Sequence, residues 1–212
     1  MSAAQYLARG DAARVAPIRA GLPLALRDLR VEFADANRAP RIVLDIPALE
    51  IAGGGQLAIC GPSGSGKTTL LNVLAGIEHP RRGMVRWGGV ELGAIRPRAA
   101  DRWRRETLGL VFQQFHLFPG LSALDNVLLP FRFDRFAIDS ANRDRASDLL
   151  ERVSVPATRR VERLSRGEMQ RVAVARALVK APAVVLAVSA VLVRLSRSPQ
   201  SAMPVVWGGT LS

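Results

Sequence analysis

Short apolar runs and stretches of helical pattern alternate along this chain of 212 residues. Short apolar runs bounded by turn residues are typical of strands. The chain has such runs at 24–33, 42–44, 49–51, 56–60, 84–87, 90–92, 108–112 and 183–188. Helical patterns occupy 69–75, 98–105, 122–129, 139–153 and the residues from 168 onward. Strands that alternate with helices predict an α/β fold.

The strands before the first helix predict a small antiparallel layer beside that core. Leu29, Val31 and Phe33 alternate with polar residues, so they would share one face of a strand. Pro47 separates two further short strands, and the glycines at 53–55 end the second of them. Several strands in succession do not fit a purely alternating arrangement of strands and helices.

The segment between the strand at 56–60 and the helix at 69–75 is rich in glycine. Residues 61–68 read G-P-S-G-S-G-K-T and fit the pattern G-x-x-x-x-G-K-[ST] of a phosphate-binding loop. Glycine lacks a Cβ, so the backbone can curl and point its N–H groups inward. The N-terminus of the following helix adds partial positive charge. Because strand, loop and helix occur in the required order, a chance turn is the weaker interpretation.

Lys67 and Thr68 carry the chemistry of this loop. The Lys67 ammonium would reach the β- and γ-phosphates of a nucleotide, and the Thr68 hydroxyl would ligate Mg²⁺. Of the 30 Lys and Arg residues, only Lys67 and Lys180 are lysine. A chain that uses Arg for nearly every cation therefore keeps a compact ammonium at a position where a planar guanidinium would not fit.

The net charge and the cysteine content limit which binding partners and which cellular compartment fit this chain. The net charge of +12 fits either an anionic partner, such as nucleic acid or lipid headgroups, or a solvated Arg-rich surface. The sequence has no nucleic-acid motif and does not interleave Arg with aromatic residues, so we expect no nucleic-acid partner. The single Cys60 excludes an internal disulfide and fits a reducing compartment. We expect Cys60 to be a small buried strand residue.

Hydropathy predicts a cytoplasmic location. A helix that spans a bilayer needs roughly 20 apolar residues. The longest apolar stretch, 181–193, is shorter and contains Pro182 and Ser189. Residues 1–21 carry charges and lack the apolar core of a signal peptide. Peripheral association with the inner face of the cell membrane would then come through a partner.

Two further segments make the motif pattern specific. Residues 111–114 read V-F-Q-Q, and residues 164–173 read L-S-R-G-E-M-Q-R-V-A. With the phosphate loop before them, these segments resemble the ATP-binding subunits of ABC transporters over about residues 24–187. The stretches at 79–83, 109–119 and 124–127 look like the subgroup that serves lipoprotein release and macrolide export.

The spacing of the motifs supports the same resemblance. Gln113 lies 46 residues after Lys67, and Ser165 lies 52 residues after Gln113. These gaps are similar to those of the compact transporter type, whereas the DNA-repair relatives carry very long insertions between the motifs.

The resemblance implies ATP and Mg²⁺ as cofactors and assigns roles to individual residues. Phe33 would stack on adenine, with a core position as the competing interpretation. Gln113 would contact Mg²⁺ or the attacking water and couple the site to the membrane subunit. The phosphates would lie on Gly61, Ser63, Gly64, Ser65, Gly66, Lys67, Thr68 and Thr69.

The resemblance also implies partners. Ser165 and Gly167 would bind the γ-phosphate of ATP held by a second copy or a paired ATPase subunit, so that the active unit is a head-to-tail dimer. Residues 115–119 would line the groove that receives a transmembrane permease subunit. Arg166 stands where the family usually has the first Gly of this motif.

The resemblance stops after Ala187. The family continues this strand with an Asp that orients Mg²⁺ and a Glu that polarises the attacking water, whereas this chain has Val188 and Ser189. Glu168 is the last carboxylate of the sequence, and no His follows it where the family has one. We therefore expect weak nucleotide binding with impaired hydrolysis, and a second explanation is a C-terminal segment that is read out of frame or truncated.

The predicted organisation is an N-terminal extension at 1–22, an ABC-type ATP-binding domain at 23–187 with a helical subdomain at about 96–160, and a divergent tail at 188–212. The fold would be an α/β P-loop NTPase core with a small antiparallel β subdomain, an α-helical subdomain and an incomplete C-terminal part. Three alternatives stay open: a non-hydrolysing regulatory subunit, a soluble P-loop kinase or GTPase, and an Arg-rich nucleic-acid binder. The Gln113 and Ser165 motifs argue against the kinase or GTPase.

Overall fold

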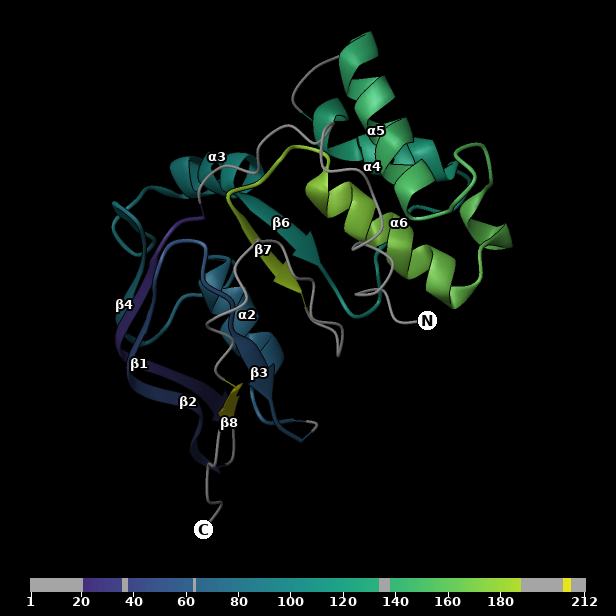
Figure 1. The fold of residues 1–212 in the computed structure, drawn as a ribbon. Coiled ribbons are helices and arrows are strands. Elements are labelled where there is room, and N and C mark those ends of the chain that lie inside the picture. The colour runs from purple at the N-terminus through teal and green to yellow at the C-terminus, as the bar shows by residue number, and fades with distance from the viewer. Residues whose placement is uncertain (1–20, 36–37, 63, 134–137, 188–203, 207–212) are drawn as a thin grey trace. The chain divides into compact units, whose positions relative to one another are not determined.

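The computed structural model describes residues 21–35, 38–62, 64–133, 138–187 and 204–206 (Figure 1). The chain divides into two compact units. One consists of Ala20–Arg104 with Arg194–Ser212, and we call it the phosphate-loop unit. The other consists of Met1–Arg19 with Arg105–Val193, and we call it the helical unit. Most of the extension predicted at 1–22 and of the tail predicted at 188–212 lies outside the described residues.

An antiparallel sheet forms one layer of the phosphate-loop unit, as the sequence predicts. It has the strand order β2-β1-β4-β5. Its strands are β1 (Leu24–Asp35), β2 (Arg38–Ile51), β4 (Arg82–Trp87) and β5 (Val90–Glu91). One face of the sheet is apolar and buried, with Leu24, Leu26, Leu29, Val31, Leu44, Ile46, Val85 and Trp87 in the core.

The predicted break at Pro47 is wrong, because β2 runs through it as one strand. β2 is an edge strand, paired on one side with β1. Proline has no N–H to donate, and an edge strand tolerates this on its free side. Opposite Pro47, the paired registers Arg27↔Ala48 and Leu29↔Ile46 leave out Asp28, whose φ is +49°.

The phosphate loop joins β3 (Ala58–Cys60) to α2 (Lys67–Leu74). β3 pairs in parallel with β8 (Pro204–Val206). α2 ends where the sequence predicts, since Gly76 has a left-handed φ of +64°. The indole Nε1 of Trp87 donates to the carbonyl of Leu74 at 2.9 Å and fastens the end of α2 to the sheet. Cys60 is exposed, so the expected burial is wrong: it is the last residue of a three-residue strand, where the chain turns into the loop.

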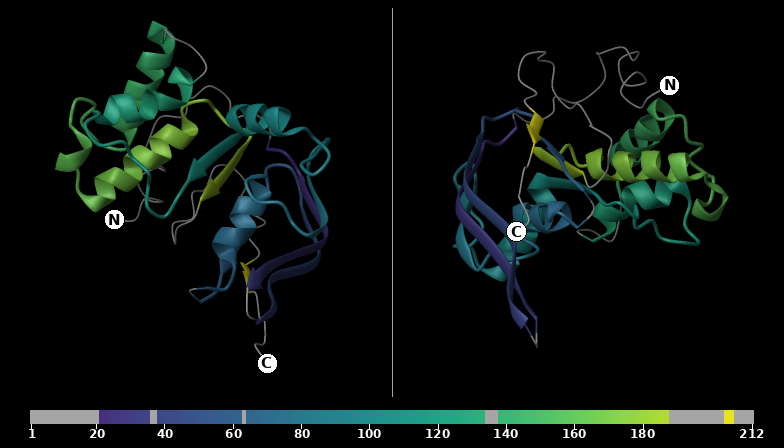
Figure 2. Two further views of the ribbon diagram at one scale, coloured as in Figure 1. Left: turned by 180° about the vertical axis from the view of Figure 1, so that it is seen from behind. Right: turned by 90° about the horizontal axis from the view of Figure 1, so that it is seen from below.

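The helical unit consists of three helices and a pair of parallel strands (Figure 1). The strands are β6 (Leu108–Val111) and β7 (Val184–Ala187), which lie side by side in both views of Figure 2. The helices are α4 (Ala123–Arg132), α5 (Ser140–Arg152) and α6 (Arg166–Leu178), with a 3-10 turn η2 at Val161–Arg163. α6 packs against the strands, and α4 and α5 pack against α6. The basic helix α3 (Pro97–Thr107) spans the sequence boundary between the units.

The core of the helical unit comes from the apolar faces that helical periodicity predicts. Ala146 and Leu150 of α5 and Val127 and Leu128 of α4 are fully buried and pack with Val172 of α6. The backbone of β6 approaches α6 closely, since a Cβ on Gly109 would come within 2.4 Å of the carbonyl oxygen of Ala177. α6 begins at Arg166, two residues earlier than predicted, because Ser165 caps it. The mixed α/β class, with antiparallel and helical parts, is confirmed.

Candidate functional site

The phosphate loop depends on glycine at two positions with left-handed backbone. Gly64 has φ +81° and Gly66 has φ +82°, a region that other residues seldom adopt. A Cβ on Gly66 would also lie 2.9 Å from the carbonyl oxygen of Val43 and from Cδ2 of Leu44. The start of α2 therefore sits against β2, at a separation that only glycine allows.

The N-terminus of α2 has neither a side-chain cap nor an acidic residue in its first turn that would compete with a bound anion. The first helical hydrogen bond runs from the amide of Leu70 to the carbonyl of Gly66, at 2.8 Å. The amides of Lys67, Thr68 and Thr69 precede it and have no intrahelical acceptor. Gly66 offers no side-chain cap, and the first turn contains no acidic residue. Partial positive charge is thus left at the point where the loop ends.

Lys67 lies across the loop. Its Nζ donates to the carbonyl of Gly61 at 2.8 Å, to the carbonyl of Pro62 at 2.6 Å and to the Oγ of Ser65 at 3.2 Å. These contacts hold the ammonium against the loop that leads into the first turn of α2. A cradle of glycine backbone, helix amides and one ammonium is the donor set that a polyphosphate requires.

The structure gathers most of the predicted phosphate-binding residues in this one turn. Gly61, Gly64, Ser65, Gly66, Lys67, Thr68 and Thr69 are contiguous around it. Ser63 lies outside the described residues. The Thr68 side chain is exposed, where a metal ion bound with phosphate would reach it. Phe33 is 47% exposed near the end of β1, so its ring is not a core side chain.

Among the described residues, no three His, Cys, Asp or Glu side chains come close enough to hold a metal ion on their own. Mg²⁺ in nucleotide sites commonly keeps several waters and uses substrate phosphates as ligands. The sequence-based predictions assign Mg²⁺ contacts to Thr68 and to Gln113, which belong to different units.

The second predicted phosphate site, at the start of α6, is already occupied by a carboxylate of the same helix. Glu168 accepts from the amide of Ser165 at 2.8 Å and from its hydroxyl at 2.9 Å, which completes a capping box. Arg159 donates to the other carboxylate oxygen at 2.7 Å. The backbone hydrogen bond from Ser165, then its hydroxyl, and more weakly Arg159, hold the pKa of Glu168 below its usual value. Gly167 is exposed beside this cap.

Gln113 is exposed in the turn that follows β6. Two residues later the backbone becomes left-handed, at Phe115 with φ +59° and His116 with φ +45°. The guanidinium of Arg176 donates to the carbonyls of both residues. Sequence reasoning missed Arg176, because one arginine among many on a helix carries no distinguishing signal.

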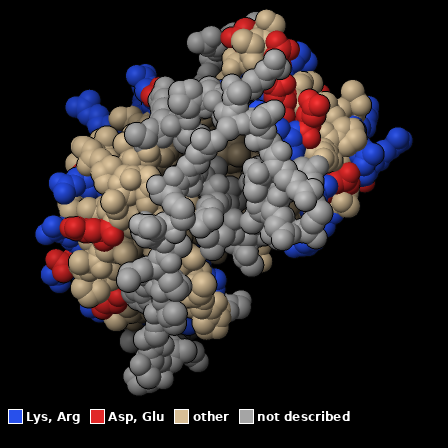
Figure 3. Space-filling view, viewed as in Figure 1, with Lys and Arg blue, Asp and Glu red and all other residues tan. Residues whose placement is uncertain are grey.

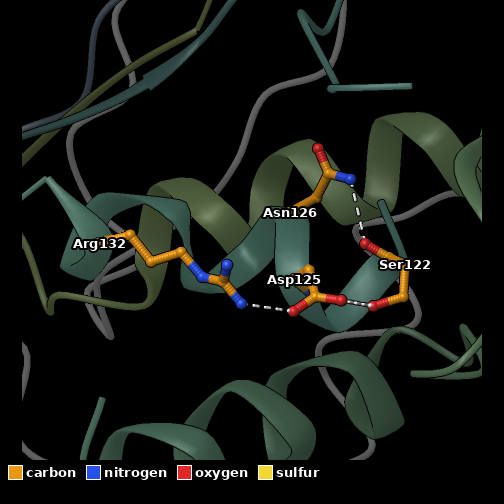
Figure 4. Close-up of polar contacts among 4 residues, drawn as sticks. All are labelled: Ser122, Asp125, Asn126 and Arg132. Atoms are coloured by element: carbon orange, nitrogen blue, oxygen red, sulfur yellow. Dashed lines mark hydrogen bonds and ion pairs between the residues drawn. The ribbon is translucent and has the colours of Figure 1, made fainter. Parts of the chain in front are cut away.

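A buried asparagine, Asn126, was also not predicted from the sequence. It binds the backbone of Phe118, at the C-terminal end of the segment that follows Gln113. Asn126 is fully buried; its Oδ1 accepts from the amide of Phe118 at 2.8 Å, and its Nδ2 donates to the carbonyls of Phe118 and Ser122. Figure 4 shows it beside Asp125, which accepts from the Ser122 hydroxyl and pairs with Arg132. The signal in the sequence is an amide at a position of α4 surrounded by apolar residues.

Charge is mixed on the described surface. On the face drawn in Figure 3, the blue Lys and Arg side chains lie among red Asp and Glu side chains. Several arginines have acidic partners, for example Arg27 with Glu50 and Arg30 with Glu32. Within the described residues, no helix combines the length and apolar character needed to cross a membrane.

Comparison with known proteins extends these observations. The model of the family "ABC transporter" matches residues 44–187. The chain is 45% identical over 165 residues to the lipoprotein-releasing system ATP-binding protein LolD of Pseudomonas syringae pv. tomato, covering 77% of this chain and 72% of the relative. It is 40% identical over 166 residues to the macrolide export ATP-binding/permease protein MacB 1 of Aeromonas hydrophila, covering 77% of this chain and 25% of that protein.

Solved structures show the same likeness. The dimeric structure of MJ0796, a bacterial ABC transporter cassette, matches with a TM-score of 0.71 at 34% identity, over 77% of this chain and 72% of that one. A structure of the same cassette in a post-hydrolysis state bound to ADP and Pi matches with the same values. The family match ends at residue 187, directly before the position where the sequence lacks the expected carboxylates.

Proposed function

The chain belongs to the ABC transporter family, as an ATP-binding subunit of the lipoprotein-release or macrolide-export type, and from this premise we propose that it powers a membrane permease. The observation that carries the proposal is the phosphate cradle at the start of α2. There Gly66, the amides of residues 67–69 and the Lys67 ammonium converge, without an acidic residue in the first turn.

In this proposal the triphosphate lies on the loop and replaces the carbonyl acceptors of Lys67 with phosphate oxygens. The charge-assisted bond to phosphate is stronger than the neutral bonds to Gly61 and Pro62, so the exchange favours the bound state. Thr68 supplies a hydroxyl to Mg²⁺, which would neutralise charge on the phosphates. Phe33 offers an exposed ring for adenine.

The partners are a transmembrane permease subunit and a second ATPase subunit. The support is that LolD is by name part of a lipoprotein-releasing system, that MacB 1 is by name an ATP-binding/permease protein, and that MJ0796 is dimeric. We propose that Ser165 and Gly167 face ATP held by the other subunit, and that Gln113 touches its own Mg²⁺ or water. The chain would then lie at the inner face of the membrane.

Hydrolysis by this chain is proposed to be slow. Val188 and Ser189 stand where the family has the Mg²⁺-orienting Asp and the water-polarising Glu, and no Asp or Glu follows them. Loss of both groups is expected to raise the barrier by roughly 4 kcal/mol, about three orders of magnitude in rate. This observation also favours the second candidate, a subunit that binds nucleotide and regulates its partner without hydrolysing it.

The test compares binding and phosphate release in the wild-type chain and in the double variant Val188→Asp, Ser189→Glu. We expect both to bind Mg–ATP and the double variant to release phosphate faster. Lys67→Ala should lose binding in both backgrounds, whereas Lys180→Ala, the same change at the only other lysine, should not. Ordinary turnover by the wild type would refute slow hydrolysis.

If the double variant stays inactive, missing carboxylates are not the only defect. The altered C-terminal segment is then the better explanation. Reading the two other frames of the coding DNA after the Ala187 codon tests this directly: an Asp-Glu pair in one of them supports a frame change, and its absence from both contradicts it.

A further inference from the structure

The segment that follows Gln113 has a backbone that its own turn bonds do not explain. Phe115 and His116 are consecutive left-handed residues with ring side chains. Within the segment, the amide of Phe115 donates to the carbonyl of Phe112 at 3.0 Å. The amide of His116 donates to the carbonyl of Gln114 at 2.6 Å. Sparsely populated backbone of this kind persists only where surrounding structure determines it.

Arg176 supplies one external anchor. Its Nη2 donates to the carbonyl of Phe115 at 2.6 Å, and its Nη1 donates to the carbonyl of His116 at 2.7 Å. One planar guanidinium therefore holds the carbonyls of both left-handed residues. Burial lowers the pKa of Arg176 below its ordinary value, but an arginine stays cationic in proteins. Both bonds are charge-assisted and therefore stronger than bonds from a neutral donor.

Arg166, in the first turn of the same helix, supplies a second anchor. Its Cζ lies 5.8 Å from the centroid of the Phe115 ring, within the range of a cation–π contact. The ring is 9% exposed and packs against Ala173 and Ala177 of α6. Phe115 is thus held from both ends of α6, by its ring near the first turn and by its carbonyl near the last.

We propose that Arg166 and Arg176 are positioning residues that fasten the segment after Gln113 to α6. Because Ser165 and Gly167 lie at the start of α6, a displacement of that end would be passed to Gln113 through the two arginines. The anchoring follows from contacts within the helical unit alone, whereas its meaning for catalysis rests on the proposed function. It gives a role to Arg166, the residue that departs from the family motif.

Amide hydrogen exchange of the full chain without nucleotide tests the anchoring. The reporter amides are those of Phe115 and His116, which are hydrogen-bonded in the turn. Arg176→Gln should raise their exchange rates by about tenfold or more, as expected when charge-assisted hydrogen bonds are lost, and Arg166→Gln should raise them less. Arg176→Lys should fall between wild type and Arg176→Gln, since an ammonium lacks the fork that holds two carbonyls at once.

Two controls separate positioning from general destabilisation. Arg143→Gln removes an exposed arginine from α5 and should leave the reporter amides unchanged. The amide of Met169, bonded to the carbonyl of Ser165 inside α6, should keep its wild-type rate in every variant. Unchanged reporter rates in Arg176→Gln would overturn the proposal, and so would an equal increase at Met169 and the reporters.

Saturating Mg–ATP then tests the link to nucleotide. The wild-type reporters should change their exchange rate when ATP binds, and Arg176→Gln should lose that response while still binding ATP. A response of equal size in both would contradict the coupling. If calorimetry shows that the wild type binds no ATP, the proposed function fails, and the anchoring is still judged by the nucleotide-free rates.

Discussion

The helices of the two units begin in different ways. α2 has Gly66 as its N-cap, with no side-chain hydrogen bond at the cap and no acidic residue in its first turn. α4, α5 and α6 have Ser122, Asp139 and Ser165 as their N-caps, and each of these side chains accepts a hydrogen bond from a backbone amide in the first turn. Side chains thus help satisfy the helix starts of the helical unit, whereas the amides that begin α2 are left for a bound anion.

α6 shows that a helix start with Ser and Gly is not by itself a phosphate site. Ser165 and Gly167 suit a phosphate, but the Glu168 carboxylate already bonds the amide and hydroxyl of Ser165. An incoming phosphate would meet this negative charge. In the proposed dimer, the Mg²⁺ and the lysine of the second copy must therefore offset the negative charge of its ATP for this contact to be favourable. α2 needs no such help.

Among the variants that test this difference between the helix starts, we expect the largest effect from one that blocks the phosphate-binding turn before α2. Gly66→Ala forces a Cβ into left-handed backbone and to within 2.9 Å of the carbonyl oxygen of Val43. We expect ATP affinity to fall by roughly 100-fold or more, equivalent to about 2.7 kcal/mol. Calorimetric titration measures it. Gly89→Ala is the matched control, since nothing lies within 4 Å of a Cβ at that position, and it should bind ATP normally.

The next effect should come from Asn126, which fixes the approach to α4. Asn126→Ala removes a fully buried side chain and leaves the partly buried amide and carbonyl of Phe118 without their partner, and we expect a loss of about 1–3 kcal/mol in the free energy of unfolding. Urea titration measures it. Asn142→Ala on α5 should change stability by about 0.5 kcal/mol or less. Equal losses in the two variants would contradict the role given to Asn126.

The smallest effect should come from the cap of α6, and it should depend on pH. The pKa of Glu168 is lowered in the folded chain from 4.5, its ordinary value. Its ionised form therefore stabilises the fold above about pH 4.5, and this contribution is lost as the pH falls through the lowered folded pKa. Glu168→Gln should melt at a lower temperature than wild type at pH 7, and the gap should shrink at low pH. Glu151→Gln, at an exposed position of α5, should show no such trend.

Features set by neighbouring residues could be predicted from the sequence. The strand, loop and helix around Lys67 were predictable because glycine spacing and apolar period are local signals. The cap at Ser122 and the stop at Gly76 belong to the same class. The roles assigned to Phe33 and Gln113 stay predictions, as do the predicted domain boundaries.

Features set by tertiary position could not be predicted in this way. Pro47 was misread because its tolerance depends on β2 being an edge strand, which only the strand order reveals. Cys60 was misread because apolar neighbours in sequence do not determine exposure at the end of a short strand. Arg176 was missed because its partners, Phe115 and His116, lie about sixty residues away in the sequence.

The most direct test of the central claim is the stoichiometry of Mg–ATP binding, measured by isothermal titration calorimetry on the wild-type chain and on Lys67→Ala. The account predicts one site per wild-type chain, because within the described ranges the start of α2 is the one helix start that joins uncapped amides to an ammonium, and it predicts no heat of binding for Lys67→Ala. Full binding by Lys67→Ala, or a second site that persists in it, would contradict the account.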